Sequence, residues 1–176
     1  MKEKIILIVG ASGVGKDSLI KEAEKELKKE FNFIRRYINR KPDENEKNYF
    51  LEDSAFKLLK ENDYFVSFWE AHGNFYGISN ESIRKGINII SISRSKISDF
   101  ERVFDNVYVI NITLNKEELI NRLTKRGRES FEEIQKRLDR SYDKIEAKNL
   151  INFENDKLFE ESKETFIKLL KEINEL

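Results

Sequence analysis

A glycine-rich segment near the start of the chain ends in a lysine, an arrangement that binds phosphate in nucleotide-dependent proteins. Its residues are Gly10, Ala11, Ser12, Gly13, Val14, Gly15, Lys16, Asp17 and Ser18. Because glycine adopts backbone conformations closed to other residues, successive N–H groups here can point at the oxygens of one anion. We predict that the segment holds the phosphates of a nucleoside triphosphate, with Lys16 on the terminal ones. The alternative is a strand-to-helix turn that is glycine-rich for structural reasons alone.

The residue after the lysine differs from the usual pattern. A serine or threonine is expected there, because its hydroxyl binds Mg²⁺ beside the phosphates. This chain has Asp17, and Ser18 follows one position later. A carboxylate is also a hard oxygen ligand for Mg²⁺. We therefore expect Asp17 to be a metal ligand, with Mg²⁺ as a cofactor.

Apolar runs predict the elements that position this segment. Ile5–Val9 reads as a buried parallel strand, and apolar residues at helical spacing predict a helix over 16–30. Further buried strands are expected at 87–92, 107–112 and 149–153, and further helices at 96–102, 116–124, 131–147 and 156–176. Strands that alternate with helices predict an α/β fold. We expect a P-loop NTPase with three α/β/α layers and a mostly parallel sheet.

A block rich in aromatic residues, at about 36–80, interrupts this alternation. We expect it to be an inserted substrate-binding region within one domain. A single strand over Phe31–Arg40 would place Arg36 and Arg40 on one face, where they could clamp one anion. Shorter helices are predicted at 53–60, capped by Asp53, and at 81–85. We expect residues 1–176 to form one domain. Its core is predicted to consist of three segments, at about 1–35, 86–125 and 148–176.

The composition excludes several classes of protein. Lysine plus arginine and aspartate plus glutamate number 33 each, so the net charge indicates neither a nucleic acid nor a membrane partner. Cysteine is absent, which excludes disulfides and thiolate chemistry. The one histidine, His72, has no recognisable metal-ligand or nucleophile partner in the sequence, so we favour a structural or exposed histidine over a catalytic one. With no signal peptide and no membrane-length apolar run, a soluble cytoplasmic protein is expected.

Several motifs together resemble the guanylate kinase family, in that family's order and over nearly the whole chain. They are the phosphate segment, Arg40-Lys41-Pro42, Trp69 with 72–77, 122–128 and Arg137-Leu138. The resemblance implies that Arg40 and Tyr76 hold the phosphate of the acceptor. It also implies a helical lid at about 126–145, whose Arg126 and Arg137 close over the transferring phosphate.

The chain departs from guanylate kinases where those enzymes read the guanine base. Arg36 replaces a serine and Phe68 a glutamate, while Ser91 and Ser93 stand near an otherwise acidic strand end. Asn48 and Asp43 fall where the family has an acceptor-phosphate tyrosine and a second arginine. A guanine site loses heavily without its paired donors and acceptors. The pocket is therefore expected to bind more negative charge and no base.

These departures resemble the ribose 1,5-bisphosphate phosphokinases of phosphonate degradation, which are relatives of guanylate kinase. The matching motifs are 15–19, Arg36-Tyr37-Ile38-Asn39-Arg40, Ser93-Arg94, Arg126-Gly127-Arg128-Glu129 and Asn155-Asp156. The resemblance implies transfer of the ATP γ-phosphate to ribose 1,5-bisphosphate, giving 5-phosphoribosyl 1-diphosphate and ADP. Asp17 then becomes a mark of the family.

We expect the acceptor to be a small sugar phosphate whose charge is compensated by basic side chains. The residues predicted to hold its phosphates are Arg36, Arg40, Tyr76, Ser93 and Arg94, and those expected from the lid are Arg126, Arg128 and Arg137. An ionised phosphate oxygen is already a nucleophile, so no general base is needed. The alternatives are a nucleoside-monophosphate kinase with a rearranged base pocket and a non-catalytic binding module. Either a monomer or a homodimer is compatible with the sequence.

Overall fold

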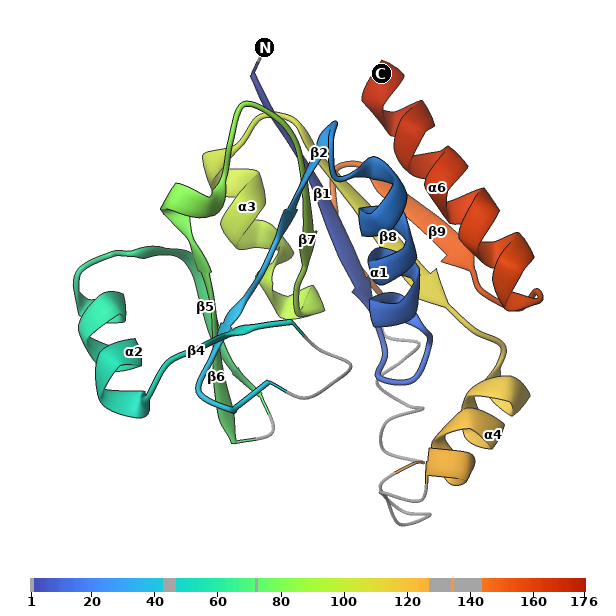
Figure 1. Ribbon diagram of the computed structural model, residues 1–176, viewed down its shortest axis with the longest axis horizontal. Helices are drawn as coiled ribbons and strands as arrows, with labels where there is room; N and C mark the ends of the chain where they lie inside the picture. Colours follow the sequence, from blue (N-terminus) through green and yellow to red (C-terminus); the bar gives the residue numbers. More distant parts are fainter. Residues whose placement is uncertain (1, 43–46, 72, 127–133, 135–143) are drawn as a thin grey trace.

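The computed structural model describes residues 2–42, 47–71, 73–126, 134 and 144–176. Its centre is a five-stranded sheet in the order β2-β7-β1-β8-β9, in which every neighbouring pair is parallel (Figure 1). The strands are β1 (Glu3–Gly10), β2 (Phe31–Ile34), β7 (Gly86–Ser91), β8 (Val107–Thr113) and β9 (Leu150–Glu154). The predicted parallel α/β sheet is confirmed.

The apolar run of β1 is buried on both faces of this sheet. Ile6 and Ile8 belong to one hydrophobic cluster, and Ile5, Leu7 and Val9 belong to the other. This division follows from the strand geometry, because successive side chains point to opposite faces. Every residue from Ile5 to Val9 is 0% exposed, as expected for the central strand of a sheet covered on both sides.

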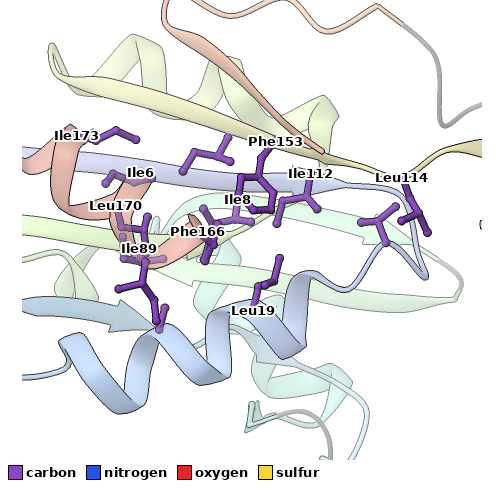
Figure 2. Packing of buried hydrophobic residues seen from close by; sticks show 14 of the residues in the cluster. Ile6, Ile8, Leu19, Ile89, Ile112, Leu114, Phe153, Phe166, Leu170 and Ile173 are labelled. Carbon is purple, nitrogen blue, oxygen red and sulfur yellow. The ribbon is translucent and has the colours of Figure 1, made fainter. Parts of the chain in front are cut away.

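Two long helices cover the first face, where they pack against each other. They are α1 (Lys16–Leu27) and α6 (Phe159–Glu175). Figure 2 shows Leu19 from α1 and Phe166 and Leu170 from α6 directed toward Ile8 and its neighbours in the sheet. The other face is covered by α3 (Ile97–Val103) and by Trp69. No helix among the described residues is both long and apolar enough to span a membrane.

A second, mixed sheet stands beside the first, in the order β4-β3-β6-β5 (Figure 1). Its strands are β3 (Tyr37–Ile38), β4 (Tyr49–Phe50), β5 (Phe65–Ala71) and β6 (Asn74–Ser79). The helix α2 (Asp53–Glu61) lies between β4 and β5 in the chain. Phe56 of α2 is fully buried and stacks on Phe65 with ring centroids 5.2 Å apart. Aromatic packing therefore attaches α2 to this sheet.

The prediction of one strand over Phe31–Arg40 is wrong. The chain leaves the main sheet after Ile34 and joins the second sheet at Tyr37, so Arg35 and Arg36 lie between two strands. The alternation of side chains along a single strand therefore cannot place Arg36 and Arg40 on one face. The arginines sit at the crossing between the sheets instead.

Three smaller expectations also differ from the structure. The N-cap of α2 is Glu52, so Asp53 is the first helical residue. The helix predicted at 81–85 is only a 3₁₀ turn over Asn80–Ser82, because the Asn88 amide binds both the N–H and the carbonyl of Arg84. Residues 144–147 are irregular, so the helix predicted over 131–147 does not reach its expected end. Most of that helix, and with it the predicted lid, lies outside the described residues.

Candidate active site

The glycine-rich segment from Gly10 to Lys16, called the phosphate loop from here on, joins β1 to α1 at the carboxyl end of the main sheet. Gly15 forms the N-cap of α1 with φ of 94° and ψ of 12°, in the left-handed region that favours glycine. At the other end of the loop, a Cβ on Gly10 would lie 2.5 Å from the Ile112 carbonyl oxygen. The loop therefore needs glycine both for its conformation and for its close approach to β8.

Lys16 lies across this loop. Its Nζ donates hydrogen bonds to the carbonyl oxygens of Gly10 and Ala11, both at 2.8 Å. The ammonium group is therefore held next to the backbone groups that would receive an anion. A cation and a helix N-terminus at one place favour negative charge there. This geometry supports the predicted phosphate-binding role of Lys16.

A pocket opens beside the phosphate loop, between α1 and the crossing of the two sheets. Its lining residues are Asp17, Ile20, Lys21, Glu24, Phe33, Ile34, Arg35, Arg36, Lys47, Asn48 and Ser91. The structure thus brings Asp17, Arg36 and Ser91 into one pocket, although they come from α1, the β2–β3 link and β7. Such a position, outside the carboxyl ends of parallel strands, is where α/β proteins bind their ligands.

Two donor groups in this pocket lack hydrogen-bond partners among the described residues. They are Asn48 Nδ2 and Ser91 Oγ, and both atoms are buried. Because buried polar groups are nearly always satisfied, unpaired donors in a pocket favour a ligand with oxygen acceptors. In the sequence, Asn48 and Ser91 were visible only as departures from a resembling family. Their convergence in one pocket was not predicted.

Tyr76 contacts both an indole and the guanidinium of Arg36, which lines this pocket. Its ring stacks on Trp69 at 5.3 Å between centroids and 6° between planes, and Arg36 Cζ lies 5.8 Å from the same ring. A cation over an aromatic face is attracted to it. The predicted pair Arg36 and Tyr76 is therefore close in space. Arg40, in contrast, is exposed beyond β3 and is not among the pocket's lining residues.

Ser93 and Arg94 follow β7 at the same edge of the sheet. The Ser93 and Ser95 hydroxyls are 3.1 Å apart. Arg94 Nη2 lies 3.5 Å from Asn111 Oδ1 on β8, and the Asn111 amide donates to Asn152 at 3.0 Å. Because Asn111 pairs in register with Val9, the Arg94 guanidinium lies close to the start of the phosphate loop.

A second, polar pocket lies along the edge strand β2, where three tyrosines meet. The Tyr37 and Tyr64 hydroxyls are 3.2 Å apart, and Tyr49 stacks at a tilt on Tyr37. Burial, followed by the hydrogen bond with Tyr64, raises the pKa of Tyr37 to about 12. The Tyr37 ring also contacts the rings of Tyr64 and Phe65, and on these contacts we assign it a packing role.

The described residues contain no group of three or more histidine, cysteine or acidic side chains that could hold a metal ion. Mg²⁺ in kinases usually takes one or two carboxylates from the protein and the remaining ligands from phosphates and water. A single carboxylate at Asp17, one residue after Lys16, fits that pattern.

Arg126 is the last residue of α4 (Lys116–Arg126), whereas Arg128, Arg137 and His72 lie outside the described residues.

Comparisons with known proteins place this geometry in a family. The family model for guanylate kinase matches residues 2–173. The protein named ribose 1,5-bisphosphate phosphokinase PhnN from Ruegeria sp. (strain TM1040) is 37% identical over 80% of this chain and 76% of that protein. The protein of the same name from Agrobacterium fabrum (strain C58 / ATCC 33970) is 37% identical over 78% of this chain and 79% of that protein.

Solved structures agree on the fold. A guanylate kinase from Anaplasma phagocytophilum aligns with a TM-score of 0.61 at 16% identity, covering 98% of this chain and 86% of that one. A gluconokinase from Sinorhizobium meliloti 1021 aligns with a TM-score of 0.56 at 16% identity, covering 98% and 94% of the two chains. At such low identity the alignments establish the kinase fold and nothing about the acceptor.

Proposed function

The chain is a phosphotransferase that belongs to the guanylate kinase family, and we propose that it transfers the γ-phosphate of ATP to ribose 1,5-bisphosphate. The observation that carries this proposal is the pocket beside the phosphate loop. Arg36 faces it, and the buried donors of Asn48 and Ser91 have no partner in the described part of the chain. Cations and neutral donors suit an acceptor rich in phosphate and hydroxyl oxygens.

The donor side of the reaction rests on the phosphate loop. We propose that the backbone of Gly10–Lys16 holds the ATP phosphates and that Lys16 binds the terminal ones. In this arrangement the N-terminus of α1 and the ammonium group are aligned before the substrate arrives. Phosphoryl transfer depends mainly on such alignment and on compensation of charge.

On the acceptor side, an oxygen of the 1-phosphate attacks the γ-phosphorus. The bond from this phosphorus to the bridging oxygen breaks, ADP leaves, and the sugar carries a diphosphate at carbon 1. Because the attacking oxygen is already ionised at neutral pH, the step needs no general base. Arg36, Arg94 and Tyr76 would hold the acceptor's phosphates. Arg40, Ser93 and the arginines Arg126, Arg128 and Arg137 remain predicted members of the site.

The carboxylate of Asp17 is the group that we expect to hold Mg²⁺, which neutralises charge on the donor phosphates when bound. Asp17→Ser is expected to lower turnover about tenfold and to shift the Mg²⁺ titration to higher concentration, because a charged ligand is replaced by a neutral one. The check is initial rate against Mg²⁺ concentration at fixed ATP. Asp105→Ser, at an exposed surface ion pair with Lys2, is the matched control. An unchanged titration and turnover in Asp17→Ser would exclude the assigned role.

One assay separates the candidate functions. ADP release is measured with ATP and Mg²⁺ in the presence of ribose 1,5-bisphosphate, of GMP, or of neither acceptor. We expect rapid release only with the sugar bisphosphate. Faster release with GMP would instead identify a nucleoside-monophosphate kinase with a rearranged base pocket. No release with either acceptor would contradict the proposed reaction.

A further inference from the structure

We infer that Asn155 is a positioning residue of the donor site, because its amide fixes the direction of one peptide group in the phosphate loop. Asn155 follows β9 and is only 3% exposed, although it is a polar residue. Its Nδ2 donates a buried hydrogen bond of 2.7 Å to the carbonyl oxygen of Val14. The inference rests on the proposal that Gly10–Lys16 holds the donor phosphates.

This hydrogen bond also fixes the direction of the Gly15 N–H, because the Val14 carbonyl and the Gly15 N–H belong to one planar peptide group. The Val14–Gly15 peptide bond is trans, so its carbonyl and its N–H point in opposite directions. Because the Val14 carbonyl is held toward Asn155, the Gly15 N–H is directed away from Asn155, and it is on this side that the proposed donor site would receive the phosphates. Without the amide, this peptide group could rotate, and one phosphate donor would lose its fixed orientation.

Gly15 is adapted to the approach of Asn155. A Cβ at position 15 would lie 2.6 Å from Asn155 Nδ2, closer than side-chain atoms approach one another. The missing side chain therefore serves two purposes, the left-handed φ of 94° and the space for the amide. This contact relates two residues that are far apart in the sequence.

The backbone around Asn155 is itself held in place. The Asn155 N–H donates to the Thr113 carbonyl at 2.9 Å, which fixes the residue to the end of β8. The neighbouring Asp156 carboxylate accepts from the Asn115 N–H at 2.8 Å, and Asn115 in turn caps the first turn of α4 through the Glu118 N–H. Two adjacent side chains thus attach the phosphate loop and α4 to the same edge of the sheet.

The test compares two asparagines at opposite ends of β9. Asn149 Nδ2 donates to the Val107 carbonyl at 2.9 Å, so Asn149→Ala removes the same kind of hydrogen bond far from the loop. We expect both variants to have a lower melting temperature, and Asn155→Ala the lower of the two, because its bond is buried whereas Asn149 is exposed. Only Asn155→Ala should weaken binding of a non-hydrolysable ATP analogue, by about tenfold in calorimetry. Its KM for the acceptor should stay unchanged.

Two results would overturn the inference. One is an Asn155→Ala protein that binds the analogue as the wild type does, and the other is an equal loss of affinity in Asn149→Ala. If Asn155→Ala does not fold, Asn155→Ser is judged by the same comparison, since serine is too short to reach Val14 in the same way. The titration contains no acceptor, so a wild type that binds the analogue but phosphorylates a different acceptor contradicts the proposed function alone. A wild type that does not bind the analogue contradicts both.

Discussion

Lys16→Met is expected to reduce kcat by about a thousandfold, because it removes the only side-chain cation of the phosphate loop from the terminal phosphates. Methionine keeps the length and much of the volume of the side chain, so the fold should remain. The lost contacts of Nζ with Gly10 and Ala11 are part-buried, and we expect a fall of a few degrees in the melting temperature at most. Steady-state ADP release measures the effect.

The control for this prediction is Lys25→Met, one of the outward-facing positions of α1. Lys25 forms an exposed ion pair with Glu22 at 2.6 Å, and such pairs contribute little. Its turnover should match that of the wild type. A Lys16→Met protein that retains more than about a tenth of wild-type kcat would show that the loop does not act through this ammonium group.

Arg36→Ala is expected to lower kcat/KM for ribose 1,5-bisphosphate about 100-fold, or ~2.7 kcal/mol, while leaving KM for ATP unchanged. The guanidinium lines the pocket that we propose for the acceptor and lies 5.8 Å from the Tyr76 ring, so its loss removes a charged donor and leaves that ring without this cation. Initial rates with each substrate varied in turn separate the two Michaelis constants. Arg36→Lys should recover only part of the loss, because lysine cannot bind a phosphate through two parallel N–H groups.

Arg102→Ala provides the surface comparison. Arg102 pairs with Asp99 on α3 at 2.8 Å, and its side chain is 75% exposed. We expect wild-type kinetics from this variant. Equal increases of both Michaelis constants in Arg36→Ala would indicate a general loosening of the pocket, and the acceptor role of Arg36 would be wrong.

The strand, loop and helix around Lys16 could be predicted because their signals are local. Five consecutive apolar residues, three glycines and a helical spacing of apolar residues all lie within the first two elements, and each signal indicates the same structure. The parallel sheet followed from the buried runs of β7 and β8 in the same way. These predictions needed no knowledge of distant contacts.

The break between Ile34 and Tyr37 could not be predicted in this way. The run from Phe31 to Ile38 stays rich in aromatic and branched residues, so its local preference for a strand continues through the crossing. Pairing decides the outcome instead: Ile34 pairs with Ile90, whereas Ile38 pairs with Tyr76 in the other sheet. Such long-range contacts override the local pattern.

The same reasoning explains why parts of the site were missed. Asn155 stood out only as part of a motif shared with the resembling family, because its contact with Val14 spans 141 positions of sequence. Asn48 and Ser91 gain meaning only because the fold buries their donors in a pocket that also contains Arg36. The charged candidates, in contrast, could be recognised in the sequence, because arginine and lysine bind phosphate and aspartate binds Mg²⁺ in many proteins.

The central claim, transfer of phosphate onto the 1-phosphate of a sugar bisphosphate, is tested most directly by identifying the product. Phosphorus NMR of a reaction with ATP, Mg²⁺ and ribose 1,5-bisphosphate should show the coupled resonances of a new diphosphate ester, formed in equal amount with ADP. The spectrum of a Lys16→Met reaction should lack them. Release of free inorganic phosphate with ADP, and no new diphosphate ester, would contradict the account.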